Sequence, residues 1–174
     1  MPSPKAGNYR REEVYELGTQ IAQQLGYKPN GDITAAIKKA GGTIEYRAPS
    51  DLEAGDSGSM IIHSIRNFTI YLSKYTSANR DRFTVAHELG HYVLHYFIIK
   101  KDNEQLEPMV CTRAGDGRVE WEANWFAAGF VMPEEIFKTI FNKRKGNLEL
   151  VAAHFGVSRS DAEIRANYLG LGTP

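Results

Sequence analysis

Two histidines and a glutamate stand in the order His-Glu-x-x-His at residues 87–91. Apolar residues recur at helical spacing from about residue 77 or 79 to residue 97, which predicts a long helix carrying all three side chains. Four residues along a helix advance about 6 Å and turn about 40° past one revolution, so His87 and His91 leave the same face. Two imidazoles placed in this way can bind one Zn²⁺ at nitrogen–metal distances of about 2.0–2.1 Å.

Glu88 is predicted to be the general base of such a site. It points about 100° away from His87, too far round the helix to be a natural third ligand. Its carboxylate can instead reach a water in the open coordination position of zinc and take its proton. The alternative is that both histidines are core residues satisfied by hydrogen bonds, and a third ligand elsewhere in the chain argues against it.

A third ligand is expected on a second helix, predicted over residues 119–132. Its first turn holds Glu120 and Glu122, although acids there also stabilise a helix without any metal. Residues two apart on a helix differ by about 200° in direction, so only one of the pair can face the metal helix. Glu120 shares a buried side with Asn124, which could hydrogen-bond a zinc-bound imidazole, whereas Glu122 is expected in a surface ion pair. The sequence therefore favours Glu120 as the third ligand.

The composition of the whole chain excludes several classes of protein. Apolar residues make up 42% of its 174 residues, which is enough to build the core of one domain. Lys and Arg number 21, as do Asp and Glu, and this balance argues against a protein whose main partner is nucleic acid. The single cysteine, Cys111, allows neither an internal disulfide nor a four-thiolate zinc site. Without an apolar stretch of about 20 residues or a secretory signal, a soluble cytoplasmic protein with no membrane partner is expected.

The elements around the site predict an α+β fold. Besides the two helices already named, helices are predicted over residues 10–25, 33–39 and, in two or three short pieces, 134–171. Strands are predicted over residues 43–47, 59–64 and 68–73, with a loop at 49–58. The last strand is expected at an edge of the sheet, where an extended substrate could add as a further strand. Residues 100–118 form a long polar connection.

Four segments of the chain carry recognisable motifs. They are Arg-Phe-Thr-Val-Ala-His-Glu-Leu-Gly-His at 82–91, Glu-x-Glu-Ala-Asn-x-Phe-Ala-Ala at 120–128, Val-Met-Pro at 131–133 and Phe-Gly-Val-Ser at 155–158. Together these segments resemble the ImmA/IrrE family of zinc-dependent metallopeptidases. The resemblance covers about residues 9–171. It implies a zincin-like fold with a small, mostly antiparallel sheet beside the His-Glu-x-x-His helix and helices on both sides.

The same resemblance implies a site and a substrate. One Zn²⁺ per chain is expected on His87, His91 and Glu120, with Glu88 as catalytic base. The implied activity is that of a zinc-dependent endopeptidase that cleaves a helix-turn-helix repressor and so derepresses genes of a mobile element or a stress response. Tyr92, His95 or an arginine could stabilise the oxyanion. His95 is otherwise expected to support the ligands or to lie on the surface.

The chain is expected to comprise a loose N-terminus (1–8), a metallopeptidase domain (9–135) and a C-terminal helical segment packed on the core (136–174). Residues 148–171 also resemble a helix-turn-helix. Two acids, Asp161 and Glu163, stand where base contacts would be needed, so packing is favoured over DNA binding and no direct nucleic-acid partner is expected. The alternatives are a toxin-like protein or a DNA-binding regulatory module in which the metal is structural.

Overall fold

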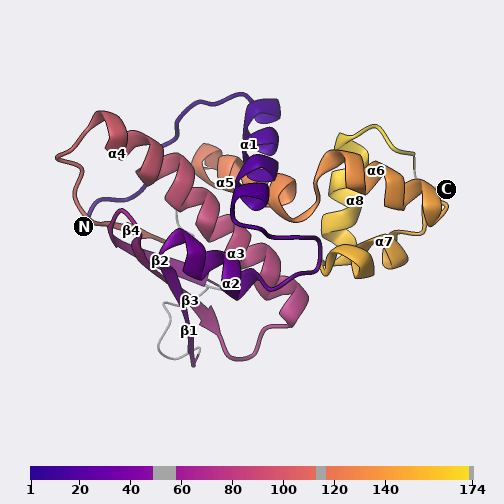
Figure 1. Cartoon of the computed structure of the whole chain (residues 1–174), viewed down its shortest axis with the longest axis horizontal. Helices are drawn as coiled ribbons and strands as arrows, with labels where there is room; N and C mark the ends of the chain where they lie inside the picture. The colour runs from indigo at the N-terminus through magenta and orange to yellow at the C-terminus, as the bar shows by residue number, and fades with distance from the viewer. Residues whose placement is uncertain (49–57, 113–116, 173–174) are drawn as a thin grey trace.

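A computed structural model describes residues 1–48, 58–112 and 117–172 of the chain. The loop predicted at residues 49–58 lies outside the described residues except for its last position. The fold is α+β, as predicted: a small sheet lies along one side of a long helix, and further helices cover the other side and one end (Figure 1).

The sheet has four strands in the order β1-β3-β2-β4. Their bounds are β1 Gly42–Arg47, β2 Gly58–Ser64, β3 Asn67–Ser73 and β4 Met109–Cys111. Because β2 is antiparallel to β3 and β4 and only β1 is parallel to β3, the sheet is mostly antiparallel, as predicted. The prediction that residues 68–73 form an edge strand is wrong. β1 pairs along the other side of β3, whose run of buried residues is typical of an interior strand, so the edges are β1 and β4.

The helix that carries His87 and His91 packs along the sheet and is longer than the sequence predicted (Figure 1). It begins as α3 (Ala78–Tyr92), where the Ser77 side chain accepts a hydrogen bond from the Arg80 amide. It continues through one π-helical segment, η2 (Val93–Phe97), into α4 (Ile98–Asp102). The wider turn is marked by a hydrogen bond from the Ile98 amide to the Val93 carbonyl five residues earlier. The helix therefore extends five residues beyond the predicted end.

Helix α5 (Gly117–Val131) packs between α3 and α1 (Arg11–Gln24). The close approach of α1 to α5 depends on two glycines. A Cβ atom on Gly129 would lie 2.0 Å from the Tyr15 carbonyl oxygen, and one on Gly18 would lie 2.3 Å from the Phe126 carbonyl oxygen. These two glycines thus permit the close packing of α1 against α5. The short helix α2 (Ile33–Ala40) is capped by Asp32, whose side chain accepts a hydrogen bond from the Ala35 amide.

The C-terminal part consists of three short helices, which lie at one end of the molecule (Figure 1). They are α6 (Glu134–Lys143), α7 (Leu148–Phe155) and α8 (Arg159–Tyr168). The side chain of Phe155 is completely buried. The ring of Tyr168 stacks on Tyr15 of α1 with centroids 4.3 Å apart. Arg165 Nε donates a hydrogen bond of 3.1 Å to the Met132 carbonyl at the end of α5. These contacts tie α6–α8 to the core.

The first eight residues form no helix or strand, yet two backbone hydrogen bonds connect them to the domain. The Val110 amide of β4 donates to the Pro2 carbonyl at 3.1 Å. The Gly7 amide donates to a carboxylate oxygen of Glu122 at 2.9 Å. The segment thus lies along the β4 edge and reaches the start of α5.

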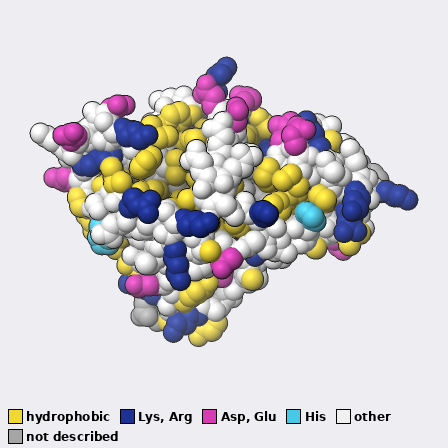
Figure 2. Space-filling model, viewed as in Figure 1, with side chains coloured by type: hydrophobic (Ala, Val, Ile, Leu, Met, Phe, Trp, Pro, Cys, Tyr) yellow, Lys and Arg dark blue, Asp and Glu magenta, His cyan; other side chains and the backbone are white. Residues whose placement is uncertain are grey.

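Basic and acidic side chains are interspersed on the face of the molecule in Figure 2, where hydrophobic side chains are visible between α1 and α4. None of the helices in the described part of the chain is both long enough and apolar enough to cross a bilayer.

Candidate metal centre

His87, His91 and Glu120 come together, as predicted. Their possible ligand atoms all lie within 4.8 Å of one another. The two Nε2 atoms are 3.1 Å apart. One Glu120 oxygen lies 3.1 Å from His87 Nε2, and the other lies 3.3 Å from His91 Nε2. The two histidines of α3 and the glutamate in the first turn of α5 therefore converge on one position.

This donor set fits zinc. Two ligand atoms at about 2.0–2.1 Å from a tetrahedral zinc lie roughly 3.3 Å from each other, close to the spacings found here. Two imidazole nitrogens and one carboxylate oxygen are ligands that zinc accepts, and three protein ligands leave a fourth position open. No fourth histidine, cysteine or acid joins this group within the described ranges 1–48, 58–112 and 117–172, so the arrangement does not match the usual four-ligand structural site.

The electrostatics of the triad also favour a cation. Burial lowers the pKa of His91 to about 4, so this ring is neutral at pH 7 and has a nitrogen lone pair to offer. Burial by itself raises the pKa of Glu120, but hydrogen bonds with His87 and His91 lower it overall and keep the carboxylate ionised. Burial likewise opposes charge on His87, yet its hydrogen bond with Glu120 and the charge of Glu88 raise its pKa overall. The negative charge that attracts a proton to His87 would attract a metal cation between the two rings.

Asn124 orients the first histidine. Its Oδ1 lies 2.8 Å from His87 Nδ1 and accepts the proton there, which leaves Nε2 directed at the triad. The prediction that Asn124 hydrogen-bonds one of the candidate ligands is confirmed. Asn124 lies one helical turn beyond Glu120 on α5, so both of these side chains reach His87 on α3.

A buried chain of hydrogen bonds orients the second histidine. His91 Nδ1 lies 3.0 Å from His95 Nδ1, and His95 Nε2 lies 2.9 Å from an oxygen of Glu122. Burial lowers the pKa of His95, so its ring is neutral and carries one proton. A carboxylate only accepts hydrogen bonds, so His95 donates through Nε2 and accepts from His91 through Nδ1. His91 is then protonated on Nδ1, and its Nε2 is left to bind a metal.

Glu122 does not lie on the surface, where the sequence places it. We expected a surface ion pair, but the side chain is fully buried and accepts hydrogen bonds from His95, the Gly7 amide and Arg118. Burial raises the pKa of Glu122, and these donors outweigh that effect and lower it overall. His95 is fully buried as well, which excludes the surface position we considered. The four-residue spacing of His91 and His95 indicates this series of hydrogen bonds in the sequence. Its acidic end, Glu122, can be placed only when the packing of α5 is known.

The π-helical segment explains why His95 reaches His91. In a regular α-helix each step of four residues turns the side chain about 40° further round, so drift accumulates after two steps. A π-helical turn contains more residues per revolution and removes part of this drift. His95 lies within η2, directly after the α-helical part that carries His87 and His91.

Glu88 is 2% exposed and lies in α3 between the two histidines. Its charge acts on His87, and with that of Glu120 it also acts on Cys111 of β4, whose pKa is raised chiefly by burial. The end of β4 is therefore near the centre. A cleft of about 570 Å³ opens over His87 and Glu120 and is lined by Arg80 and Ser158 among others.

The three candidates for oxyanion stabilisation lie in different surroundings, and one of them lines the metal cleft. The Tyr92 hydroxyl accepts a hydrogen bond from the Arg66 amide at 2.9 Å, next to the sheet. His95 is engaged by Glu122 behind the ligands. An arginine remains, because Arg80 lines the same cleft as His87 and Glu120.

Comparison with known proteins agrees with this geometry. No curated protein matches the chain. Among solved structures, a Mycobacterium tuberculosis transcriptional regulator is similar with a TM-score of 0.65 and 15% identity, over 92% of this chain and 57% of that one. The chain thus spans little more than half of the regulator's length, and at this identity the likeness shows the fold alone. The model of the IrrE N-terminal-like domain matches residues 46–167, which include α3, α5 and all of α8 except its last residue. Since this match extends over well more than half of the chain, the protein belongs to the family of IrrE N-terminal-like domains, whose function is of the metallopeptidase type.

Proposed function

We propose that this protein is a zinc-dependent endopeptidase. The observation that carries the proposal is the convergence of His87, His91 and Glu120 at one point with Glu88 adjacent on the same helix. The hydrogen bonds to Asn124 and His95 support it, because they leave both Nε2 atoms free for a metal. A pair of core histidines would need no acid between their rings.

His87, His91 and Glu120 would hold the metal. When bound, zinc supplies a Lewis acid that polarises a peptide carbonyl and makes water more acidic. Glu88 accepts a proton from the water that attacks the carbonyl carbon, and returns it to the amine that leaves as the C–N bond breaks. Arg80 is our candidate for the donor that stabilises the carbonyl oxygen as it gains charge, since it lines the cleft.

An extended substrate would add to β4 rather than to the interior strand β3. β4 is an edge strand. Its last residue, Cys111, lies close enough to Glu88 and Glu120 for their negative charges to contribute to the raised pKa of its thiol, after the larger effect of burial. A peptide paired with β4 would run toward the metal centre. Part of this edge is already paired, because the Val110 amide bonds the Pro2 carbonyl, so the substrate would replace or extend that contact.

The substrate that we propose is a helix-turn-helix repressor, in the cytoplasm. Membership of the IrrE-like family supports this choice, and the likeness to a transcriptional regulator concerns the fold only. A DNA-reading role for α8 is less favoured, because Ala162, Arg165 and Ala166 bury one face of the helix in this chain itself.

The deciding experiment incubates the chain with the helix-turn-helix protein encoded beside its gene, with and without a chelator. Cleavage should occur only without the chelator. The Glu88→Gln variant should keep both fold and zinc but lose cleavage, because an amide cannot accept the proton of water. Cleavage at the wild-type rate by this variant would exclude Glu88 as base. Loss of zinc from it would indicate a ligand instead.

A further inference from the structure

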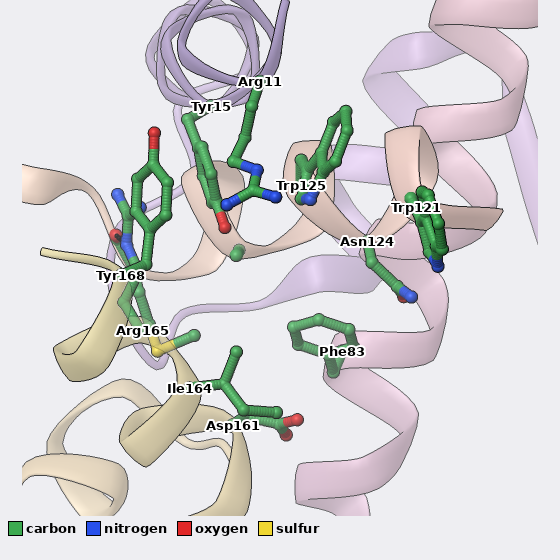
Figure 3. A pocket seen from close by; sticks show the side chains of 12 residues that line it. Arg11, Tyr15, Phe83, Trp121, Asn124, Trp125, Asp161, Ile164, Arg165 and Tyr168 are labelled. Atoms are coloured by element: carbon green, nitrogen blue, oxygen red, sulfur yellow. Dashed lines mark hydrogen bonds between the residues drawn. The ribbon is translucent and has the colours of Figure 1, made fainter. Parts of the chain in front are cut away.

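A second pocket, of about 480 Å³, lies beside the metal cleft between α1, α5 and α8 (Figure 3). Its volume is in the range of about 300–1,000 Å³ that encloses small ligands. The pocket and the cleft share Phe83, Asn124 and Asp161, so the two spaces adjoin at the α3–α5 contact. A peptide bound across the metal centre could therefore place one side chain in this pocket.

Five of the twelve residues that line the pocket are aromatic. Phe83 faces the pocket from α3, and Trp121 and Trp125 line it from α5 (Figure 3). Trp121 is 57% exposed, and Ile164 on the α8 side is 62% exposed. Large apolar side chains with this much exposed surface often mark a binding site when they gather around a hollow.

Two guanidinium groups give the pocket a positive charge. Arg11 extends from α1 between Tyr15 and Trp125, with its Cζ 5.1 Å from the Trp125 ring centroid (Figure 3). Arg165 is 2% exposed, and its Nη1 atom makes no hydrogen bond to any residue that the structure describes. Neither arginine forms an ion pair with an acid in the described ranges.

The one acid that lines the pocket forms no ion pair with either arginine in the described ranges, so the lining keeps one more positive than negative charge. Asp161 belongs to the capping box of α8, where its Oδ2 accepts hydrogen bonds from the Ser158 amide and hydroxyl. A ligand that matches the pocket must combine apolar surface with a negative group. A carboxylate fits best, because the planar guanidinium fork can bind both of its oxygens at once.

We propose that this pocket binds an acidic side chain of the substrate, preferentially glutamate, close to the bond that is cut. The aromatic walls cover the methylene stem, and Arg11 and Arg165 bind the carboxylate. This inference rests on the proposed peptidase function for its place beside the scissile bond. The binding itself requires no hydrolysis and can be measured separately.

The protein offers its own probe, because its two tryptophans both line the pocket. Tryptophan fluorescence of zinc-loaded Glu88→Gln protein is followed during titration with acetylated and amidated alanine pentapeptides. These carry glutamate, glutamine or lysine at the centre, and a pentaalanine with a free C-terminal carboxylate tests the other source of the same chemistry. The glutamate peptide should give a saturable change with a Kd lower than that of the glutamine peptide by about tenfold or more.

Variants locate the interaction. Arg11→Gln should weaken the preference for glutamate, because Arg165 is then the one arginine left in the lining, and Arg11→Glu should shift the preference toward lysine. Arg144→Gln is the matched control, because Arg144 is an exposed arginine at the end of α6, away from the pocket, and it should leave the preference unchanged. Circular dichroism checks that each variant is folded.

Equal Kd values for the glutamate and glutamine peptides, or no saturable change with any peptide, would overturn the inference. So would a response to the free C-terminal carboxylate alone. Absence of cleavage by the wild-type protein would count against the peptidase function but not against a glutamate preference in this titration.

Discussion

His95 Nε2 lies 2.9 Å from a carboxylate oxygen of Glu122, and neither side chain is exposed. This pair stands behind the candidate ligand His91 and fixes which of its nitrogens carries the proton. Through the Gly7 amide, which also bonds Glu122, the N-terminal segment is linked to the same chain of hydrogen bonds. Support for the metal centre thus comes from three separate parts of the sequence.

Glu122→Gln should weaken zinc binding by about 10–100-fold, the usual effect of losing such a supporting carboxylate. The amide no longer supplies the charge that holds the His95 proton on Nε2. Zinc affinity is measured by competition with a chromophoric chelator. Glu120→Gln should weaken binding more, because it removes a direct ligand, whereas Glu149→Gln on the exposed side of α7 should have no effect. If Glu122→Gln alone abolished binding while Glu120→Gln retained it, the two roles would have to be exchanged.

His87→Ala and His91→Ala should each abolish stoichiometric zinc binding, because the two ligands that remain hold the ion weakly. Metal analysis of the purified proteins should show about one zinc per wild-type chain and almost none in either variant. His63→Ala is the control, since His63 is exposed on β2 away from the triad. Unchanged occupancy in His87→Ala or His91→Ala would contradict the site.

Features that depend on local spacing were predictable from the sequence. The phase of one helix places His87 and His91 together, and the phase of a second separates Glu120 from Glu122. The same reasoning gave Asn124 its hydrogen bond to His87. The start of α3 follows from capping by the Ser77 side chain. The end of α5 follows from Pro133, which has no amide hydrogen to continue the helix.

Features that depend on which elements meet were not predictable. The position of β3 inside the sheet results from pairing with β1, and nothing in residues 68–73 specifies that neighbour. Glu122 points away from the metal, as the helical phase required, but that side of α5 is covered by His95 and by the N-terminal segment. The π-helical segment that brings His95 into place has no local sequence pattern that we could identify.

Gly129→Ala should destabilise the fold by about 1–3 kcal/mol or more, because the added methyl group would overlap backbone. The new Cβ would lie 2.0 Å from the Tyr15 carbonyl oxygen, and backbone atoms cannot move aside as a flexible side chain can. Urea unfolding followed by circular dichroism measures the change. Gly172→Ala is the control, because no atom lies within 4 Å of its Cβ position. Equal midpoints for the two variants would show that α1 can move away from α5 at little cost.

Truncation before residue 148 should lower the stability or solubility of the rest of the protein. Phe155 is fully buried, and Arg165 closes the end of α5 through the Met132 carbonyl. Because a truncated chain that does not fold gives no measure of degree, Phe155→Ala provides a graded test, with an expected loss of about 3–5 kcal/mol in the free energy of unfolding. Leu150→Ala, at a position that is 48% exposed, should cost far less.

If α7 and α8 instead served to read DNA, Phe155→Ala would leave the core stable, and the intact chain would bind a specific duplex with an affinity that falls steeply as salt increases. We expect Phe155→Ala to destabilise the core and the intact chain to bind no specific duplex, because one face of α8 is buried against the domain that holds the metal centre.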